Sequence, residues 1–350
     1  DYDLNSVANT IYLNPVGEME FKGMSSDVLF FKDFQEKSGI KMEIIRHGKY
    51  KSAVEPFLNN EMSPENREQI TSILQSVWQV IVQDIATSRK LSIEQINSIA
   101  ENLSGRTPEK ALALKLIDKI AYEDEYHNGI KKALKLPKDE DYKTISIIDY
   151  AKNNALKAPV SEDAIAVVYA QGIIWGGEGD ETYIGEQSLK RALGSIRKDD
   201  NIKAVVLRID SPGGSALTSE LIWREVALTK QKKPVIVSMG NTAASGGYYI
   251  ACGANRIFAE PTTITGSIGV FGQLPNLAQL SKNLGIKSQL VQTHKNAADY
   301  SIFEPIQDNF KEVITQSIES VYGTFLKRVA DGRKMSIEQV DAVAQGRVWS

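Results

Sequence analysis

Residues 164–170 read AIAVVYA, a short apolar run rich in β-branched residues that is typical of a buried strand. Two similar runs follow at residues 204–209 (AVVLRI) and 235–238 (VIVS). Helical stretches are predicted between them, near residues 187–196 and 219–229. Parallel strands joined by crossover helices are covered on both faces, so they read as continuous apolar runs. The alternation therefore predicts an α/β domain built on a parallel sheet.

Two longer helices are predicted from apolar stripes at helical spacing. One stripe runs through residues 70–85, behind Ser63 as a capping residue and Pro64 as the first helical residue. The second stripe runs through residues 314–329. We expect both helices to pack against a core.

Short turns rich in small residues follow two of the predicted strands, at residues 210–215 (DSPGGS) and 241–248 (NTAASGGY). Gly213 and Gly214 can point backbone N–H groups toward one anionic oxygen. Ser245, followed by Gly246, can present a nucleophile at the start of a helix. An ordinary turn and a helix-capping serine explain the same stretches, so these motifs alone leave both interpretations open.

The chain also contains a degenerate internal duplication. Residues 8–15 (ANTIYLNP) match residues 254–261 (ANRIFAEP), and residues 89–95 (RKLSIEQ) match residues 333–339 (RKMSIEQ), in the same order. A spacing this long indicates a duplicated domain rather than a repeat array. In this register the first copy lacks the part that precedes the serine turn, and the second copy stops before the first one does.

We therefore expect a fragment of a longer protein with three parts. Residues 1–121 are predicted to be the C-terminal part of a first, truncated domain, and residues 164–350 a second domain. Residues 122–163 are richer in charge and are predicted to be a connector.

A nucleophilic serine needs a base, and the three histidines are weak candidates. His47 and His294 fall at matching places in the two copies, which favours a shared structural role, and His127 lies in the connector. Residues 50–57 (YKSAVEPF) align with residues 299–306 (DYSIFEPI), which places Lys51 where the second copy has Tyr300. A lysine particular to one copy fits a division of labour between two copies, although an exposed surface lysine is the alternative.

Composition and charge exclude several classes of protein. With 42% apolar and 24% charged residues, the chain is an ordinary globular protein rather than a disordered or fibrous one. A net charge of −3 without long single-sign runs disfavours a nucleic-acid partner. The single cysteine, Cys252, cannot form an internal disulfide and is expected in the core. The longest apolar run, near residues 164–175, is too short to span a bilayer.

Four motifs, together with the duplication, resemble the signal peptide peptidase A family, also called protease IV, in its long duplicated form. The motifs are residues 50–57, 210–214, 242–248 (TAASGGY) and 265–270 (TGSIGV), in the family's order. The resemblance implies tandem Clp-protease/crotonase-like domains of the ββα superhelix type, with the first copy truncated at its N-terminus. It also implies a Ser-Lys dyad assembled across the two domains, a homotetramer and an upstream membrane anchor.

Carried over by position, the resemblance makes Ser245 the nucleophile, Lys51 the general base and Ser267 a hydroxyl that orients the lysine. Backbone N–H groups of Gly213, Gly214 and Gly246 would form the oxyanion hole. A free lysine has a pKa near ~10.4, so a base near neutral pH needs a pKa about three units lower. Burial without a nearby carboxylate can supply this change.

The function implied is that of a serine endopeptidase that degrades cleaved signal peptides and other apolar extended peptides. The resemblance places it on a bacterial inner membrane with its catalytic domains facing the periplasm, and no metal or other cofactor is expected. The alternative is a crotonase-like acyl-CoA enzyme, which uses paired backbone N–H groups but needs neither a serine nucleophile nor Lys51. An inactive scaffold is the third possibility.

Overall fold

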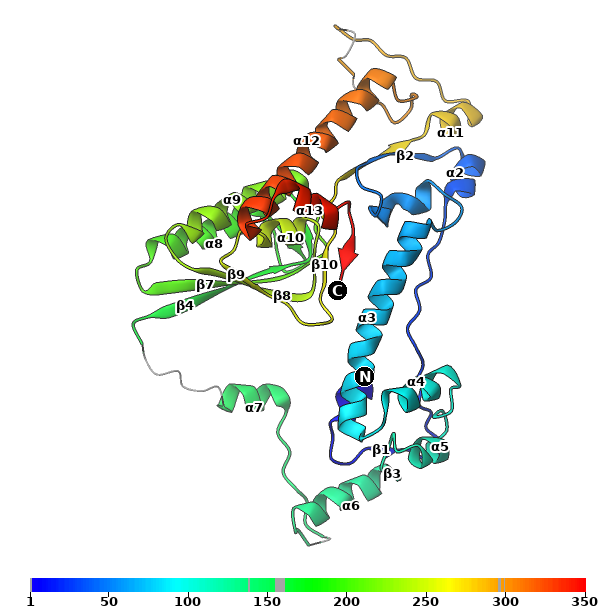
Figure 1. Ribbon diagram of the computed structural model, residues 1–350, viewed down its shortest axis with the longest axis vertical. Helices are drawn as coiled ribbons and strands as arrows, with labels where there is room; N and C mark the ends of the chain where they lie inside the picture. Colours follow the sequence, from blue (N-terminus) through cyan, green and yellow to red (C-terminus); the bar gives the residue numbers. More distant parts are fainter. Residues whose placement is uncertain (1, 138, 155–160, 295–296, 299) are drawn as a thin grey trace. The chain divides into compact units, whose positions relative to one another are not determined.

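The computed structural model describes residues 2–137, 139–154, 161–294, 297–298 and 300–350. Asp299 of the aligned segment 299–306, and residues 138 and 155–160 of the expected connector, lie outside the described residues. The chain forms two compact units. The first unit is made of residues Asp1–Ser25 and Leu74–Ser161, and the second unit of residues Ser26–Ile73 and Glu162–Ser350 (Figure 1).

A mixed sheet organises the second unit, with strand order β12-β10-β8-β7-β4 and β9 paired to β8. Strands β4, β7, β8, β9 and β10 run parallel, and β12 is antiparallel to β10. The three strands predicted from apolar runs are confirmed, although the third continues to Ala244, directly before Ser245. The strand bounds are β4 (Ala164–Gln171), β7 (Ile202–Ser211), β8 (Val235–Ala244), β9 (Arg256–Phe258), β10 (Ile264–Gly266) and β12 (Val348–Trp349).

Helices α8 (Glu186–Lys198), α9 (Ala216–Lys230) and α10 (Gly246–Ala251) lie on one face of this sheet (Figure 1). The first two confirm the predicted crossover helices. Their apolar residues and the inward-facing residues of β4, β7 and β8 form one core, in which Leu207, Ile209 and Ile250 are fully buried. The chain is therefore a mixed α/β protein. A short parallel pair, β5 (Ile173–Ile174) and β6 (Tyr183–Ile184), contributes Ile174 and Ile184 to this core.

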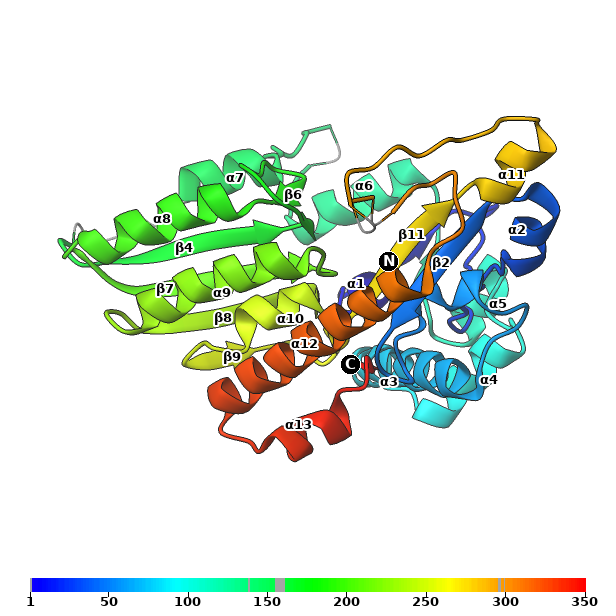
Figure 2. The ribbon, with the colours of Figure 1, turned by 90° about the horizontal axis from the view of Figure 1, so that it is seen from above.

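A β-ribbon joins two parts of the second unit that are far apart in sequence. Strand β2 (Lys41–Arg46) pairs antiparallel with β11 (Phe271–Asn276), with Arg46 opposite Phe271. Helix α12 packs against both strands, and Figure 2 shows it beside them. The remaining elements of this part are α2 (Lys32–Ser38), the 3-10 helix η1 (Ser52–Phe57), α11 (Ala278–Asn283), α12 (Asp308–Arg333) and α13 (Ile337–Val343).

Helix α12 and helix α3 (Pro64–Arg89) are the two long helices predicted from the apolar stripes. Helix α3 begins at Pro64, and the Ser63 hydroxyl accepts a hydrogen bond from the Asn66 N–H (3.2 Å), as the capping signal predicted. Helix α12 packs against α10 through a hydrophobic cluster that includes Tyr249, Cys252 and Phe325. Cys252 is fully buried, which confirms its expected place in the core.

The first unit is largely helical and has its own core, which includes Ile85, Ile96 and Leu116. Strands β1 and β3 form a short parallel pair. The elements that lie wholly in this unit are α1 (Tyr2–Ser6), β1 (Tyr12–Leu13), α4 (Ile93–Glu101), α5 (Pro108–Ala113), β3 (Lys119–Ile120), α6 (Glu123–Ala133) and α7 (Ile147–Asn154). In the described part of the chain no helix is long and apolar enough to cross a membrane.

The duplicated sequence segments fold alike locally. Ser92 caps the N-terminus of α4 and Ser336 caps that of α13, each in a capping box with the glutamine three residues later. Lys90 and Lys334, two residues before these serines, both have a left-handed backbone (φ 55° and 57°). The duplication of whole domains, the truncation of the first copy and the division at residues 121 and 163 remain predictions. The compact units are not divided in that linear way, because residues 26–73 belong with residues 162–350.

Candidate active site

Ser245 occupies the sharp turn between strand β8 and helix α10. Its backbone has φ 52° and ψ −118°, a conformation that residues other than glycine rarely adopt. Its N–H donates to the Gly266 carbonyl (2.9 Å), and its side chain makes no capping hydrogen bond to α10. The hydroxyl is therefore not used as a helix cap, and it lines a cleft instead.

Lys51 reaches this hydroxyl from the loop that follows β2. The β-ribbon pairing fixes where the loop starts, and the His47 N–H donates to the Val270 carbonyl (3.0 Å). Lys51 is only 4% exposed. Its Nζ lies 3.3 Å from Ser245 Oγ, 3.0 Å from Ser267 Oγ and 3.2 Å from the Ser267 carbonyl oxygen. Burial lowers the pKa of Lys51 from 10.5 to about 8, because an ammonium loses its hydration there.

Ser267 is held in place by the chain segment before β12. It follows β10 with a left-handed backbone (φ 51°), and its N–H donates to the Arg347 carbonyl (2.6 Å). The same segment packs against the lysine, since a Cβ on Gly346 would lie 2.6 Å from Lys51 Cβ. Residues 345–347 therefore contact both Lys51 and Ser267.

The predicted glycines gather around Ser245. Gly213 has φ 98°, and a Cβ on it would lie 2.5 Å from the Gly246 nitrogen. A Cβ on Gly246 would lie 3.2 Å from the Gly214 nitrogen. The Gly213 N–H donates to Ser211 Oγ (3.1 Å). Among the residues that the structure describes, the N–H groups of Gly214 and Gly246 have no protein acceptor.

These groups open into a cleft of about 580 Å³ in the second unit. Tyr249, Val321 and Phe325 contribute apolar walls, and Ile173, Trp175 and Phe271 are partly exposed at the lining. Tyr249 is fixed by a hydrogen bond from its hydroxyl to Glu220 (2.6 Å), and Glu220 also pairs with Arg328 of α12. The cleft thus combines the Ser245 hydroxyl, one buried amine and an apolar lining.

The histidines make their contacts elsewhere. His47 stacks on Tyr322 (3.9 Å between ring centroids) and lies 2.8 Å from a Glu319 oxygen through its Nδ1. His127 bonds to Tyr142, and His294 lies 3.0 Å from the Thr293 hydroxyl. None of the three lines the cleft around Ser245. Across the described ranges, no cluster of three or more His, Cys, Asp or Glu side chains is placed to hold a metal ion.

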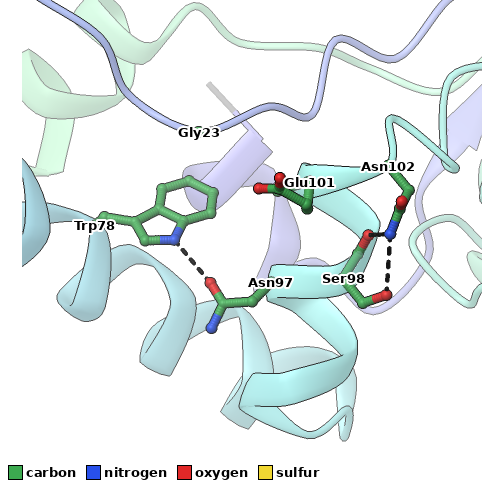
Figure 3. A pocket seen from close by; sticks show the side chains of 7 residues that line it. Gly23, Trp78, Asn97, Ser98, Glu101 and Asn102 are labelled. Atoms are coloured by element: carbon green, nitrogen blue, oxygen red, sulfur yellow. Dashed lines mark hydrogen bonds between the residues drawn. The ribbon is translucent and has the colours of Figure 1, made fainter.

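A second hollow, of about 430 Å³, lies in the first unit and is lined by Trp78, Asn97, Ser98 and Glu101 (Figure 3). The Trp78 indole N–H already donates to Asn97 Oδ1 (2.8 Å). Ser98 Oγ accepts from the Asn102 amide (3.4 Å), and Asn97, Ser98 and Glu101 are exposed. This hollow pairs no hydroxyl with a buried amine, unlike the cleft around Ser245.

Sequence reasoning missed the residues that hold the lysine segment. Gln69, Gly346 and Arg347 carry no motif of their own, and their contacts join parts of the chain that are hundreds of residues apart. The only available signal was the position of Gln69 on the predicted helix, which faces the core there.

The fold and cleft define a mixed α/β protein with a serine hydroxyl beside a buried lysine amine. The model of peptidase family S49 matches residues 1–137 and 227–350. The chain belongs to peptidase family S49, in agreement with the resemblance carried by its motifs.

Full-length similarity supports this membership. The chain is 37% identical to Protease 4 of Salmonella typhi and 36% identical to Protease 4 of Haemophilus influenzae, over 100% and 99% of its length. It is 33% identical to the chloroplastic serine protease SPPA of Arabidopsis thaliana, over 100% of its length. These alignments cover 57%, 58% and 53% of the three relatives, so the chain spans about half their length.

Among solved structures, a ClpP1 mutant from Listeria monocytogenes matches 53% of this chain and 82% of its own, with a TM-score of 0.34 and 17% identity. A TM-score this low does not establish a shared fold. The Clp-protease/crotonase-like superhelix therefore remains a prediction beyond the mixed α/β class.

Proposed function

We propose that this chain is a serine peptidase in which Ser245 is the nucleophile and Lys51 the general base. The observation that carries the proposal is the distance of 3.3 Å between Ser245 Oγ and the Nζ of a lysine that is only 4% exposed. Membership of peptidase family S49 supports it.

The surroundings of Lys51 favour a neutral amine that is aimed at Ser245. A neutral amine has two hydrogens and one lone pair. Ser267 offers two acceptors, its hydroxyl and its carbonyl oxygen, at 3.0 Å and 3.2 Å. If both hydrogens go to Ser267, the lone pair is left for the Ser245 proton. This is the orienting role that we assign to Ser267, and its hydroxyl brings no negative charge that would raise the lysine pKa again.

The reaction then proceeds by acyl transfer. Ser245 Oγ bonds to the peptide carbonyl carbon as its proton passes to Lys51 Nζ. The tetrahedral intermediate collapses, the C–N bond breaks, and the leaving amine takes that proton. Water next attacks the ester and gives a proton to Lys51. The C–Oγ bond then breaks, the acid product leaves, and the proton returns to Ser245.

The oxyanion of each tetrahedral intermediate needs preorganised donors. We assign this role to the N–H groups of Gly214 and Gly246, which lie beside Ser245 and have no acceptor among the described protein atoms. Gly213 shapes the turn, because its own N–H is bonded to Ser211.

The proposed substrates are apolar extended peptides, above all released signal peptides. The partly exposed Ile173, Trp175 and Phe271 at the cleft support an apolar substrate. The inner-membrane location, the periplasmic orientation, the membrane anchor and the homotetramer belong to the same proposal and rest on the family resemblance alone. The acyl-CoA alternative would leave the Ser245–Lys51 contact without a role, so we favour the peptidase.

The test is fluorophosphonate labelling between pH 6 and pH 10 of the parent, Ser245→Ala and Lys51→Ala. A fluorophosphonate reacts with an activated serine, so we expect labelling of the parent to rise with pH around 8, where the amine becomes neutral. Labelling should vanish in Ser245→Ala and fall by about a hundredfold or more in Lys51→Ala.

Lys49→Ala is the matched control, because Lys49 is an exposed lysine two residues from Lys51. It should label like the parent. If Lys51→Ala retained labelling within a few-fold of the parent, the assignment of the base would be wrong.

A further inference from the structure

Gln69 has a buried carboxamide that makes two hydrogen bonds to distant parts of the chain. It lies on helix α3 and is 3% exposed. Its Nε2 donates to Ser52 Oγ (2.9 Å), and its Oε1 accepts from the Val348 N–H (2.7 Å). A backbone N–H can only donate, so the Val348 bond fixes which end of the amide faces which partner.

Both hydrogen-bond partners of Gln69, Ser52 and Val348, are next in sequence to residues that form or support the Lys51 site. Ser52 directly follows Lys51. Val348 follows Arg347, whose carbonyl accepts the Ser267 N–H (2.6 Å). One carboxamide thus connects the segment that carries the amine to the segment that holds Ser267, which lies 3.0 Å from that amine.

Glu68, the residue before Gln69, bridges the same two segments. Its carboxylate accepts from the Tyr50 hydroxyl (2.9 Å) and pairs with Arg347 (2.9 Å). The Glu68 side chain is 54% exposed, however, and exposed ion pairs stabilise little in water. Gln69 is therefore the buried side-chain connection, beside the backbone bond from the Tyr50 N–H to the Gln345 carbonyl (2.9 Å), and an unpaired amide there would be costly.

We propose that Gln69 is a positioning residue that holds the Lys51 amine against Ser267 and Ser245 by tying Ser52 to Val348. The effect of Gln69 on catalysis rests on the proposed function, whereas its two hydrogen bonds do not. Without the carboxamide, the loop that carries Lys51 keeps the backbone bond from Tyr50 to Gln345 but loses its link to Val348, and water can reach the amine.

Loss of the Gln69 carboxamide should change the pKa of Lys51. The groups facing its amine are the hydroxyls of Ser245 and Ser267, the Ser267 carbonyl and the Phe271 ring, whose centroid is 5.7 Å away. Burial alone accounts for the lowered pKa of Lys51. A hydrated amine would therefore return toward the ordinary lysine value.

The experiment compares Gln69→Met with the parent. Methionine has nearly the same length but cannot make either hydrogen bond. The Lys51 titration midpoint is measured by acetic anhydride labelling between pH 6 and pH 11 with peptide mass spectrometry, which needs no peptidase activity. Fluorophosphonate labelling and thermal unfolding are measured on the same samples. Gln75→Met, the same change at an exposed position of the same helix, is the control.

In Gln69→Met we expect the Lys51 midpoint to rise by about one pH unit and fluorophosphonate labelling to fall about tenfold. Gln75→Met should match the parent in both. A midpoint that stays at the parent value in folded Gln69→Met would overturn the proposal, even if the melting temperature falls.

Ser52→Ala removes one of the two bonds and decides the question if Gln69→Met does not fold. It should raise the midpoint by a smaller amount, and an unchanged midpoint would count against the proposal. Failure of the proposed function looks different, because Lys51→Ala would then keep its fluorophosphonate labelling whatever the Gln69 variants do to the Lys51 midpoint.

Discussion

Ser245 adopts a backbone conformation that suits glycine better than serine. With φ 52° and ψ −118°, its Cβ is crowded by the neighbouring backbone. Such a backbone conformation costs of order 1–3 kcal/mol of stability and persists only where the surrounding structure holds it. Here the Gly266 carbonyl accepts the Ser245 N–H (2.9 Å), and the residue lies between a buried strand and helix. The strain places the hydroxyl beyond the end of the sheet, where it meets Lys51.

This strain should be measurable as stability. We expect Ser245→Gly to be more stable than Ser245→Ala by about 1 kcal/mol, because glycine tolerates the positive φ and alanine does not. Neither variant should label with a fluorophosphonate. Urea unfolding of the two variants at one pH is the measurement, and equal free energies of unfolding would show that this backbone is not strained.

At the scale of elements, the segment before strand β12 approaches the lysine loop so closely that residue 346 has no room for a side chain. Gly346 has φ 75°, and a Cβ on it would lie 2.6 Å from Lys51 Cβ and 2.7 Å from the Lys51 nitrogen. Gly272, on strand β11, is different. A Cβ there would meet only the side chains of Ile318 and Ile314, at 3.5 Å and 3.7 Å, which are ordinary contacts.

We therefore expect Gly346→Ala and Gly272→Ala to differ strongly. Gly346→Ala should lose about 1–3 kcal/mol of unfolding free energy and most of its fluorophosphonate labelling, since the lysine loop must move. Gly272→Ala should stay close to the parent in both. Labelling rates and urea unfolding test the pair, and parent-like labelling of Gly346→Ala would show that Lys51 does not need this close packing.

At the scale of the whole molecule, the buried amine makes folding depend on pH. The pKa of Lys51 is about 8 in the folded protein and 10.5 without burial. Between these values the unfolded chain holds more protons than the folded one, so stability rises with pH in this window. Below about pH 8 both states are protonated and the full cost of burying the ammonium is present, about 3 kcal/mol for the whole pKa difference.

Lys51→Met should remove this dependence, because methionine does not titrate. The difference in unfolding free energy between Lys51→Met and the parent should fall by about 2–3 kcal/mol as the pH rises from 7 to 10, because only the parent gains stability. Lys49→Met, at an exposed lysine, should keep the parent's pH dependence. Free energies of unfolding at several pH values are the measurement, and parallel curves for the parent and Lys51→Met would rule out a buried amine.

The sequence predicted three strands of the sheet in the second unit but few of the contacts between distant parts of the chain. Strands at residues 164–170, 204–209 and 235–238 were predictable because parallel strands joined by crossover helices read as apolar runs, although Ile165, Val167 and Tyr169 of the first strand are exposed. The nearness of Lys51 to Ser245 was expected only from the family resemblance, and the structure places them 3.3 Å apart. The β2–β11 pairing and the hydrogen bonds of Gln69 were not predictable, because a contact between residues far apart in the sequence leaves no local period in either partner.

The late position of residues 345–348 has a consequence for how the protein is made. They are synthesised roughly 100 residues after Ser245, which at ~5–20 residues per second is a delay of roughly 5 to 20 s. Until they emerge, Ser267 lacks the Arg347 carbonyl and Gln69 lacks Val348. A growing chain therefore carries the Ser245 hydroxyl and the Lys51 amine before the segment that contacts both Lys51 and Ser267 has been made.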